Sequence, residues 1–295
     1  MPLTCNPMRG GSSTHAICVS RDPEVGRVVG AALSVAGVSV EYFDVLPSEI
    51  GDVALIVVDR VTRQAASAAL RTLGAPVVVV GDDLDDDGLI TLMLEAPVSH
   101  LVGDLQDRDL GITSEKLVTG EIFGLEKYIT AGAKVGERVV VTQSDKRAAI
   151  GEVASWAEAV GARIPIVHRL VNVVDELLMN ALREAIGKTG GAVLRWGSDD
   201  RTVAISVSDP FGVLRQRDVI DHVRRARDER GRPQLDQAGA GLGLYLVLAN
   251  VASLIVNVDP GHQTEVVCLF DLARAGSRSI ASGVRSLHVF SATSG

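Results

Sequence analysis

The sequence predicts an α/β protein in two parts, a parallel sheet covered by helices on both faces and then an α+β two-layer sandwich. Over residues 15–104, continuous apolar runs alternate with amphipathic stretches, as they do around a buried parallel sheet. Over residues 137–272, strand-like runs are grouped with helices suited to one face of a sheet. The chain has 295 residues, which is enough for two domains that each bury a core.

In the N-terminal part, β-branched runs predict strands, and capping residues delimit the helices between them. Asp22 and Pro23 are typical of a helix start, and Gly74 is typical of a helix end. The predicted strands are 15–20, 39–45, 53–59, 76–81 and 100–104, and the predicted helices are 23–37, 63–73 and 88–95.

In the C-terminal part, the same signals predict an antiparallel pair and a long apolar helix opened by Pro165. Helical stretches over 105–135 are expected to join the two parts. The predicted strands are 137–143, 192–198, 202–209, 254–259 and 264–271, and the predicted helices are 145–160, 165–186 and 242–251.

The composition indicates a globular protein, with 46% hydrophobic and 22% charged residues. A net charge of −8 argues against non-specific binding to nucleic acid or to an anionic membrane. Cys5, Cys18 and Cys268 lack the paired spacing of a zinc site or a disulfide framework, and the N-terminus lacks the apolar core of a secretory signal. The uncharged stretch 239–258 is interpreted as a buried helix and strand. We therefore expect a cytoplasmic protein that contacts neither nucleic acid nor membrane directly.

A first candidate motif lies on the long helix, where Glu176 and Asn180 are four residues apart and project from one face. Two polar groups on an otherwise apolar helix are costly unless they meet a ligand or a partner. An amide oxygen suits Mg²⁺, a carboxylate can orient or deprotonate a hydroxyl group, and Arg183 is placed to reach a phosphate. The alternative is an amphipathic helix whose polar residues meet only water.

A second candidate motif, Asp209 to Gly212, follows the strand 202–209. The carboxylate can accept a hydrogen bond from an exocyclic amino group, and Gly212 allows a flat ring to approach the backbone. The alternative is a simple turn that ends the strand, because Asp-Pro commonly starts turns.

A third candidate motif is glycine-rich and opens a helix. Its backbone N–H groups can approach an anion, and a helix N-terminus favours negative charge. The residues concerned are Gly239, Gly241, Leu242 and Gly243. The spacing does not match a dinucleotide fingerprint, because Leu244 stands where that fingerprint has its third glycine.

In this order, the three motifs resemble the N, G1 and G2 boxes of the gyrase, histidine-kinase and mismatch-repair ATPase superfamily, over residues 137–272. The resemblance implies a Bergerat-type sandwich with ATP and Mg²⁺ as cofactors. It makes Glu176 the catalytic residue, Asn180 the Mg²⁺ ligand and Asp209 the reader of adenine.

The same resemblance makes the glycines of the third motif the phosphate cradle, and Thr264 matches the threonine that supports the adenine-binding aspartate. The second motif departs from the family pattern D-x-G-x-G, because only Gly212 follows closely here. Residues 214–238 correspond to the ATP lid, in which an arginine suits the γ-phosphate. The choice among Arg215, Arg224 and Arg225 stays open, as does a solvated charged helix.

The N-terminal part resembles the flavodoxin-like receiver domain of two-component signalling, and Asp59 ends the strand that carries the phosphoacceptor in receivers. Asp22 supplies only one carboxylate of the acidic pair that holds Mg²⁺ there. Gly81 and the Gly103-Asp104 pair stand where receivers carry a Ser or Thr and a Lys. We interpret this part as a degenerate receiver-like domain used for docking, with Asp59 as a candidate phosphoacceptor.

The expected organisation is a flexible tail (1–13), the receiver-like domain (14–112), a linker (113–136), the ATPase domain (137–272) and a C-terminal tail (273–295). The resemblance is strongest to anti-sigma-factor serine/threonine kinases, which implies phosphorylation of a partner such as a sigma factor or its antagonist. The alternatives are a non-catalytic regulator that sequesters a partner, a histidine-kinase-like sensor component and a small ATP hydrolase. A homodimer is left open.

Overall fold

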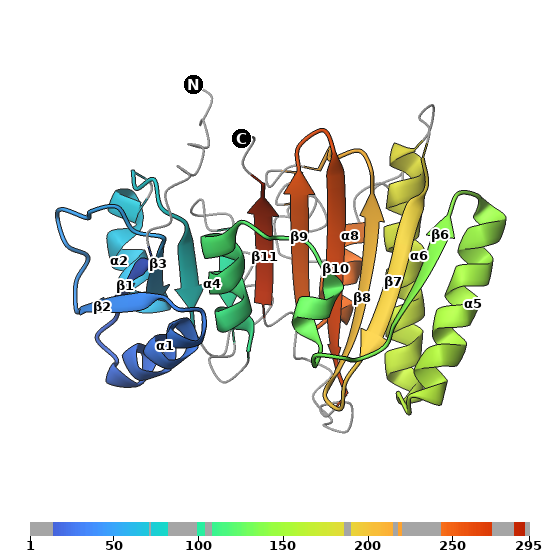
Figure 1. The fold of residues 1–295 in the computed structure, drawn as a ribbon, viewed down its shortest axis with the longest axis horizontal. Coiled ribbons are helices and arrows are strands. Elements are labelled where there is room, and N and C mark those ends of the chain that lie inside the picture. The colour runs from blue at the N-terminus through green and yellow to red at the C-terminus, as the bar shows by residue number, and fades with distance from the viewer. Residues whose placement is uncertain are drawn as a thin grey trace, which may run out of the picture.

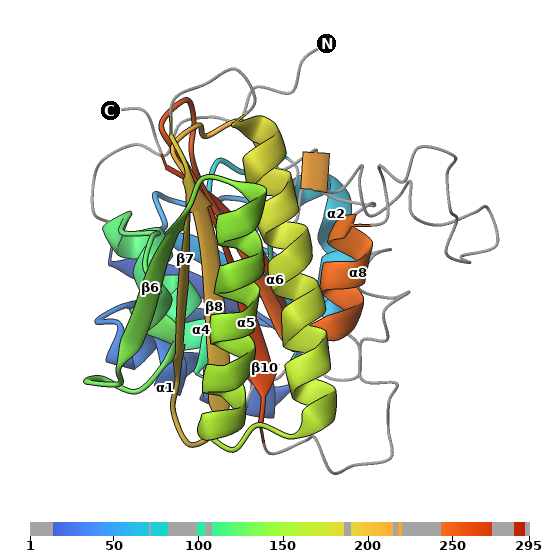
Figure 2. The same cartoon turned by 90° about the vertical axis from the view of Figure 1, so that its right-hand side faces the viewer.

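A computed structural model describes residues 14–70, 72–81, 99–103, 108–185, 190–214, 218–219, 243–272 and 286–292. The chain is mixed α/β, as the sequence predicts. The described strands form one 11-stranded sheet of order β2-β1-β3-β4-β5-β11-β9-β10-β8-β7-β6 (Figure 1). Helices cover both faces of this sheet (Figure 2).

The N-terminal half of the sheet is parallel throughout, as its continuous apolar runs predict. Its helix α1 begins as expected, because the side chain of Asp22 accepts a hydrogen bond from the backbone N–H of Glu24 at 2.9 Å. The elements are β1 (His15–Val19), α1 (Pro23–Val35), β2 (Ser39–Phe43), β3 (Leu55–Asp59), α2 (Arg60–Leu70), β4 (Val77–Val80) and β5 (His100–Val102). The predicted helix 88–95 lies outside the described residues.

In the C-terminal half, antiparallel strands carry three helices on one face. Helix α5 starts with a reciprocal capping box between Thr142 and Asp145, and α6 has Pro165 in its first turn. The elements are β6 (Val135–Val140), α5 (Gln143–Ala159), α6 (Ile164–Glu184), β7 (Ala192–Ser198), β8 (Thr202–Asp209), α8 (Gly243–Asn250), β9 (Ser253–Asp259) and β10 (Gln263–Asp271).

Strand β11 (Ser286–Ser291) joins the two halves into one sheet. It pairs antiparallel with β5, with His288 opposite His100, and parallel with β9. This strand falls in the segment 273–295 that was expected to be a tail, so that segment includes a buried strand of the sheet. The two parts therefore share one sheet. The division into a receiver-like domain (14–112) and an ATPase domain (137–272) stays a prediction.

The segment that was expected to be only a linker forms a layer of the fold. It contains α4 (Asp109–Thr119) and a 3-10 helix, η1 (Leu125–Tyr128), on the sheet face opposite α5, α6 and α8 (Figure 2). Leu110, Leu117 and Tyr128 are buried in one apolar cluster with residues of α1, β9 and β10. Helix α4 therefore packs on both halves of the sheet.

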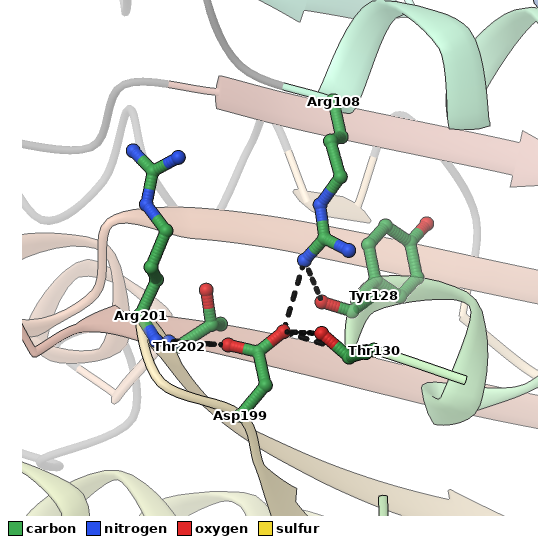
Figure 3. Close-up of polar contacts among 6 residues, drawn as sticks. All are labelled: Arg108, Tyr128, Thr130, Asp199, Arg201 and Thr202. Carbon is green, nitrogen blue, oxygen red and sulfur yellow. Dashed lines mark hydrogen bonds and ion pairs between the residues drawn. The ribbon is translucent and has the colours of Figure 1, made fainter. Parts of the chain in front are cut away.

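A cluster around Asp199 ties the ends of this segment to the β7–β8 turn (Figure 3). The Asp199 carboxylate accepts hydrogen bonds from the backbone N–H (2.9 Å) and hydroxyl (3.0 Å) of Thr130 and from Arg108 Nη2 (3.1 Å). The backbone N–H groups of Arg201 and Thr202 donate to its other oxygen. Desolvation acts to raise the pKa of Asp199, but these donors outweigh it and lower the pKa to about 2.

A second cluster, here called the junction network, is buried between α4, η1, β9 and β10. The ammonium group of Lys116 donates to the hydroxyl of Tyr128 and to Oδ1 of Asn257, both at 2.8 Å. Asn257 Nδ2 in turn donates to Oε2 of Glu265 at 2.9 Å. Lys116 is 0% exposed and lies 3.8 Å from the ring centre of Phe290 on β11.

Burial lowers the pKa of Lys116 from 10.5 to about 7. The carboxylates of Glu265 and Asp109 act in the opposite direction, and the charge of Lys127 adds to the lowering.

No helix in the described part of the chain is both long and apolar enough to cross a membrane.

The lowered pKa of Lys116 predicts that stability rises with pH. Between pH 7 and 10.5 the unfolded chain holds a proton at Lys116 that the folded chain releases, so the free energy of unfolding increases with pH in this window. We expect a rise on the order of 1–2 kcal/mol between pH 7 and 8.5, measured by urea denaturation as wild type minus Lys116→Met. Lys134→Met, at an exposed lysine, serves as the control. Its free energy of unfolding should rise with pH as that of wild type does. An equal pH dependence in Lys116→Met would contradict the prediction.

Candidate functional site

Helix α6 presents Glu176 and Asn180 together on one side. Its apolar stripe, which includes Leu170, Val174 and Leu178, is buried against the sheet. Both polar residues are half-buried, and Asn180 Nδ2 donates a hydrogen bond to Glu176 Oε1 at 3.2 Å. This hydrogen bond uses the amide nitrogen and leaves the Asn180 oxygen as an acceptor.

The first residue of α8, Gly243, lies against Glu176. A Cβ atom built on Gly243 would overlap with the Glu176 carboxylate, so a side chain at this position would displace it. Helix α8 packs against α6 with Leu244 and Leu248 buried between them. The end of the glycine-rich motif and the first motif, about sixty residues apart in sequence, therefore meet in space.

Asp209 and Thr264 lie directly opposite each other in the pairing of β8 with β10. Opposed residues of antiparallel strands project from the same face, which here is the face covered by α6. Thr264 is 3% exposed, and its hydroxyl oxygen has no hydrogen-bond partner among the described residues. A buried hydroxyl without a partner costs about 1–3 kcal/mol, so this position favours a bound polar group.

The turn after β8 uses its aspartate locally. Asp209 Oδ1 accepts a hydrogen bond from the backbone N–H of Phe211 at 3.0 Å, as in a strand-ending turn. Gly212 has a φ of +56°, and its Cβ would overlap with the backbone at Asp259 and Gly261. The structure therefore gives Gly212 a packing role against the β9–β10 turn. That this glycine also allows a flat ring to approach the backbone stays a prediction.

The remaining residues of the predicted site are less defined by contacts. Arg183 is exposed near the end of α6. Gly239, Gly241 and Leu242 lie outside the described residues, as do the lid arginines Arg215, Arg224 and Arg225.

Asp59 lies in the N-terminal half of the sheet, apart from the site on α6. Its two oxygens accept hydrogen bonds from the hydroxyl of Ser20 and, at 2.6 Å, from the backbone N–H of Thr62. Asp59 therefore caps the start of α2. Its phosphorylation stays a prediction.

The sequence interpretation missed the junction network and the Asp199 cluster. Asn257 lies in the uncharged stretch that was interpreted only as a buried helix and strand. Lys116 carried no signal because its partner Asn257 is 141 positions away. Glu265 directly precedes the apolar run of a predicted strand, and a charge in a buried strand was the one available sign of a polar network.

Comparisons with known proteins leave the family open. No family model matches the chain. One solved structure, from the SiaB-SiaC complex of Pseudomonas aeruginosa, aligns at 15% identity and a TM-score of 0.35 over 46% of this chain and 88% of that one.

The contact of Gly243 with Glu176 predicts opposite effects for two glycine substitutions. Gly243→Ala should lower the free energy of unfolding by about 1 kcal/mol, because the new methyl group displaces Glu176 and breaks its hydrogen bond to Asn180. Gly151→Ala, in α5 with no atom within 4 Å of the added carbon, should raise it by about 1 kcal/mol. Urea denaturation measures both, and a stabilising Gly243→Ala would contradict the contact.

Proposed function

We propose that the C-terminal half of the sheet binds ATP with Mg²⁺, in a site formed by α6, the start of α8 and the paired ends of β8 and β10. The observation that carries this proposal is the meeting of the first and third motifs at Glu176 and Gly243. A triphosphate site built from these motifs requires the helix that carries Glu176 to contact the N-terminus of the helix that begins at Gly243.

The residues present fit an adenine nucleotide at two points. The unpartnered hydroxyl of Thr264 beside Asp209 offers hydrogen-bonding capacity for the amino edge of a base. The amide oxygen of Asn180, which the hydrogen bond to Glu176 does not use, is a hard ligand of the kind that Mg²⁺ accepts together with phosphate oxygens. Mg²⁺, when bound, would neutralise charge on the phosphates.

Within this proposal, each residue of the site has its own role. Asp209 and Thr264 orient the base, and the N-terminus of α8 faces the phosphates. Glu176 accepts a proton from, or positions, an incoming hydroxyl group. The hydrogen bond from Asn180 Nδ2 holds the Glu176 carboxylate in place for that role.

The output that fits these roles best is control of a protein partner by phosphorylation, in the manner of the anti-sigma-factor serine/threonine kinases. The support is the motif resemblance together with a carboxylate placed beside the glycine-opened helix. The partner is proposed only as a protein that presents a Ser or Thr hydroxyl group.

Isothermal titration of the full chain with ATP, with and without Mg²⁺, tests the proposal. We expect Mg²⁺ to tighten ATP binding in wild type. Asn180→Ala should remove this effect, with a loss of affinity in Mg²⁺ of about tenfold or more, since it deletes a metal ligand. An ATP affinity that changes neither with Mg²⁺ nor with this substitution, or no ATP binding at all, would overturn the proposal.

Asn172→Ala is a matched control, because Asn172 is an exposed residue on the same helix. It should bind ATP as wild type does. Steady release of phosphate from ATP without a partner, lost in Glu176→Gln, would indicate an ATP hydrolase in place of a kinase.

A further inference from the structure

Strand β10 carries the candidate nucleotide site on one face and the junction network on the other. Thr264 and Glu265 are consecutive, so their side chains project to opposite faces of the sheet. Thr264 lies opposite Asp209 on the α6 side. Glu265 lies opposite Asn257 on the α4 side and is 3% exposed. One peptide unit therefore separates the two sites.

The carboxylate of Glu265 is the point at which β10 holds the α4–η1 segment. Oε2 of Glu265 accepts hydrogen bonds from the backbone N–H of Gly124 at 3.0 Å and from Asn257 Nδ2 at 2.9 Å. Asn257 accepts in turn from Lys116. A change in the position of β10 at residue 265 thus reaches both the loop before η1 and the last turn of α4, where Lys116 lies.

Buried charges make this connection sensitive to small movements. In a low-dielectric interior, interaction energies between charges depend steeply on distance, and a partly satisfied network is costly. Burial brings the pKa of Lys116 to about 7, so the lysine is close to the balance between its charged and neutral forms. Its surroundings include the charged groups of Glu265, Asp109 and Lys127.

Helix α4 extends this connection to the N-terminal half of the sheet. It packs against α1, where Gly111 brings it close to the backbone of Ala32. Leu110 of α4 shares its apolar cluster with Val29 and Leu33 of α1. A continuous chain of contacts therefore runs from β10 through α4 to α1.

We propose that the α4–η1 segment senses occupancy of the nucleotide site from behind, through Glu265 and Lys116, and transmits it to the N-terminal half of the protein. This inference rests on the proposed ATP site. When a base forms hydrogen bonds with Thr264 and Asp209, it restricts the movement of β10 at residue 264. The hydrogen bonds of Glu265 in the junction network then become more stable. The N-terminal half then presents a different surface to a partner according to whether nucleotide is bound.

Hydrogen–deuterium exchange of the full chain, with and without saturating Mg²⁺ and ATP, tests this inference. In wild type we expect ATP to slow exchange both in peptides around Asn180 and in peptides covering 109–119, the latter by at least about fivefold, the lower end of usual allosteric coupling. In Lys116→Met, ATP should still protect the peptides around Asn180 but should no longer protect 109–119.

Two further variants control this experiment. Lys134→Met, at an exposed lysine, should respond to ATP as wild type does. Glu265→Gln keeps the shape of the side chain and should uncouple 109–119 as Lys116→Met does, which covers the case in which Lys116→Met does not fold. Protection around Asn180 without any at 109–119 in wild type would overturn the sensor and leave the ATP site standing. No protection anywhere would overturn both.

Discussion

The candidate site depends on the contact between Glu176 and Gly243. Helix α6 is apolar on the side that packs on the sheet, and it carries Glu176 and Asn180, both half-buried, at the edge of that buried surface. Glu176 is confined there between the Asn180 amide and the start of α8. Any residue larger than glycine at position 243 would displace the carboxylate from this place. The position of a polar pair is thus fixed by apolar packing around it.

The junction between the two halves of the sheet depends on a different kind of interaction. Strand β11 fills the gap between β5 and β9, and α4 covers the junction. Buried polar groups hold this region, and His288 on β11 lies 3.1 Å from Asp109 on α4. A buried polar network contributes less to stability than well-packed apolar residues would, but it allows one arrangement and disfavours others. This property suits a segment that connects two functional parts.

Local signals predicted most of the elements. The strands β7 and β8 lie where the sequence indicated, and Asp22, Pro165 and Thr142 to Asp145 explain where α1, α6 and α5 begin. Long-range pairing was not predictable in the same way. The position of β11 depends on β5, nearly two hundred residues earlier, and a six-residue strand of mixed polar and apolar residues does not indicate its partner.

The site shows the same division. The spacing of Glu176 and Asn180 indicated a shared helix face, and that arrangement is observed. The unpartnered hydroxyl of Thr264 and the packing role of Gly212 depend on which strands become neighbours, so the sequence alone could not reveal them. Lys116 was missed for the same reason, since a buried lysine is recognisable only from the partners that surround it.

A crystal structure of the full chain with Mg²⁺ and a non-hydrolysable ATP analogue tests the central claim most directly. The account predicts the adenine amino group within hydrogen-bond distance of the Asp209 carboxylate, the Thr264 hydroxyl engaged, and Mg²⁺ bound by Asn180 and phosphate oxygens. A nucleotide seated away from α6 and β10, or one that leaves Asn180 and Asp209 without contact, would contradict it.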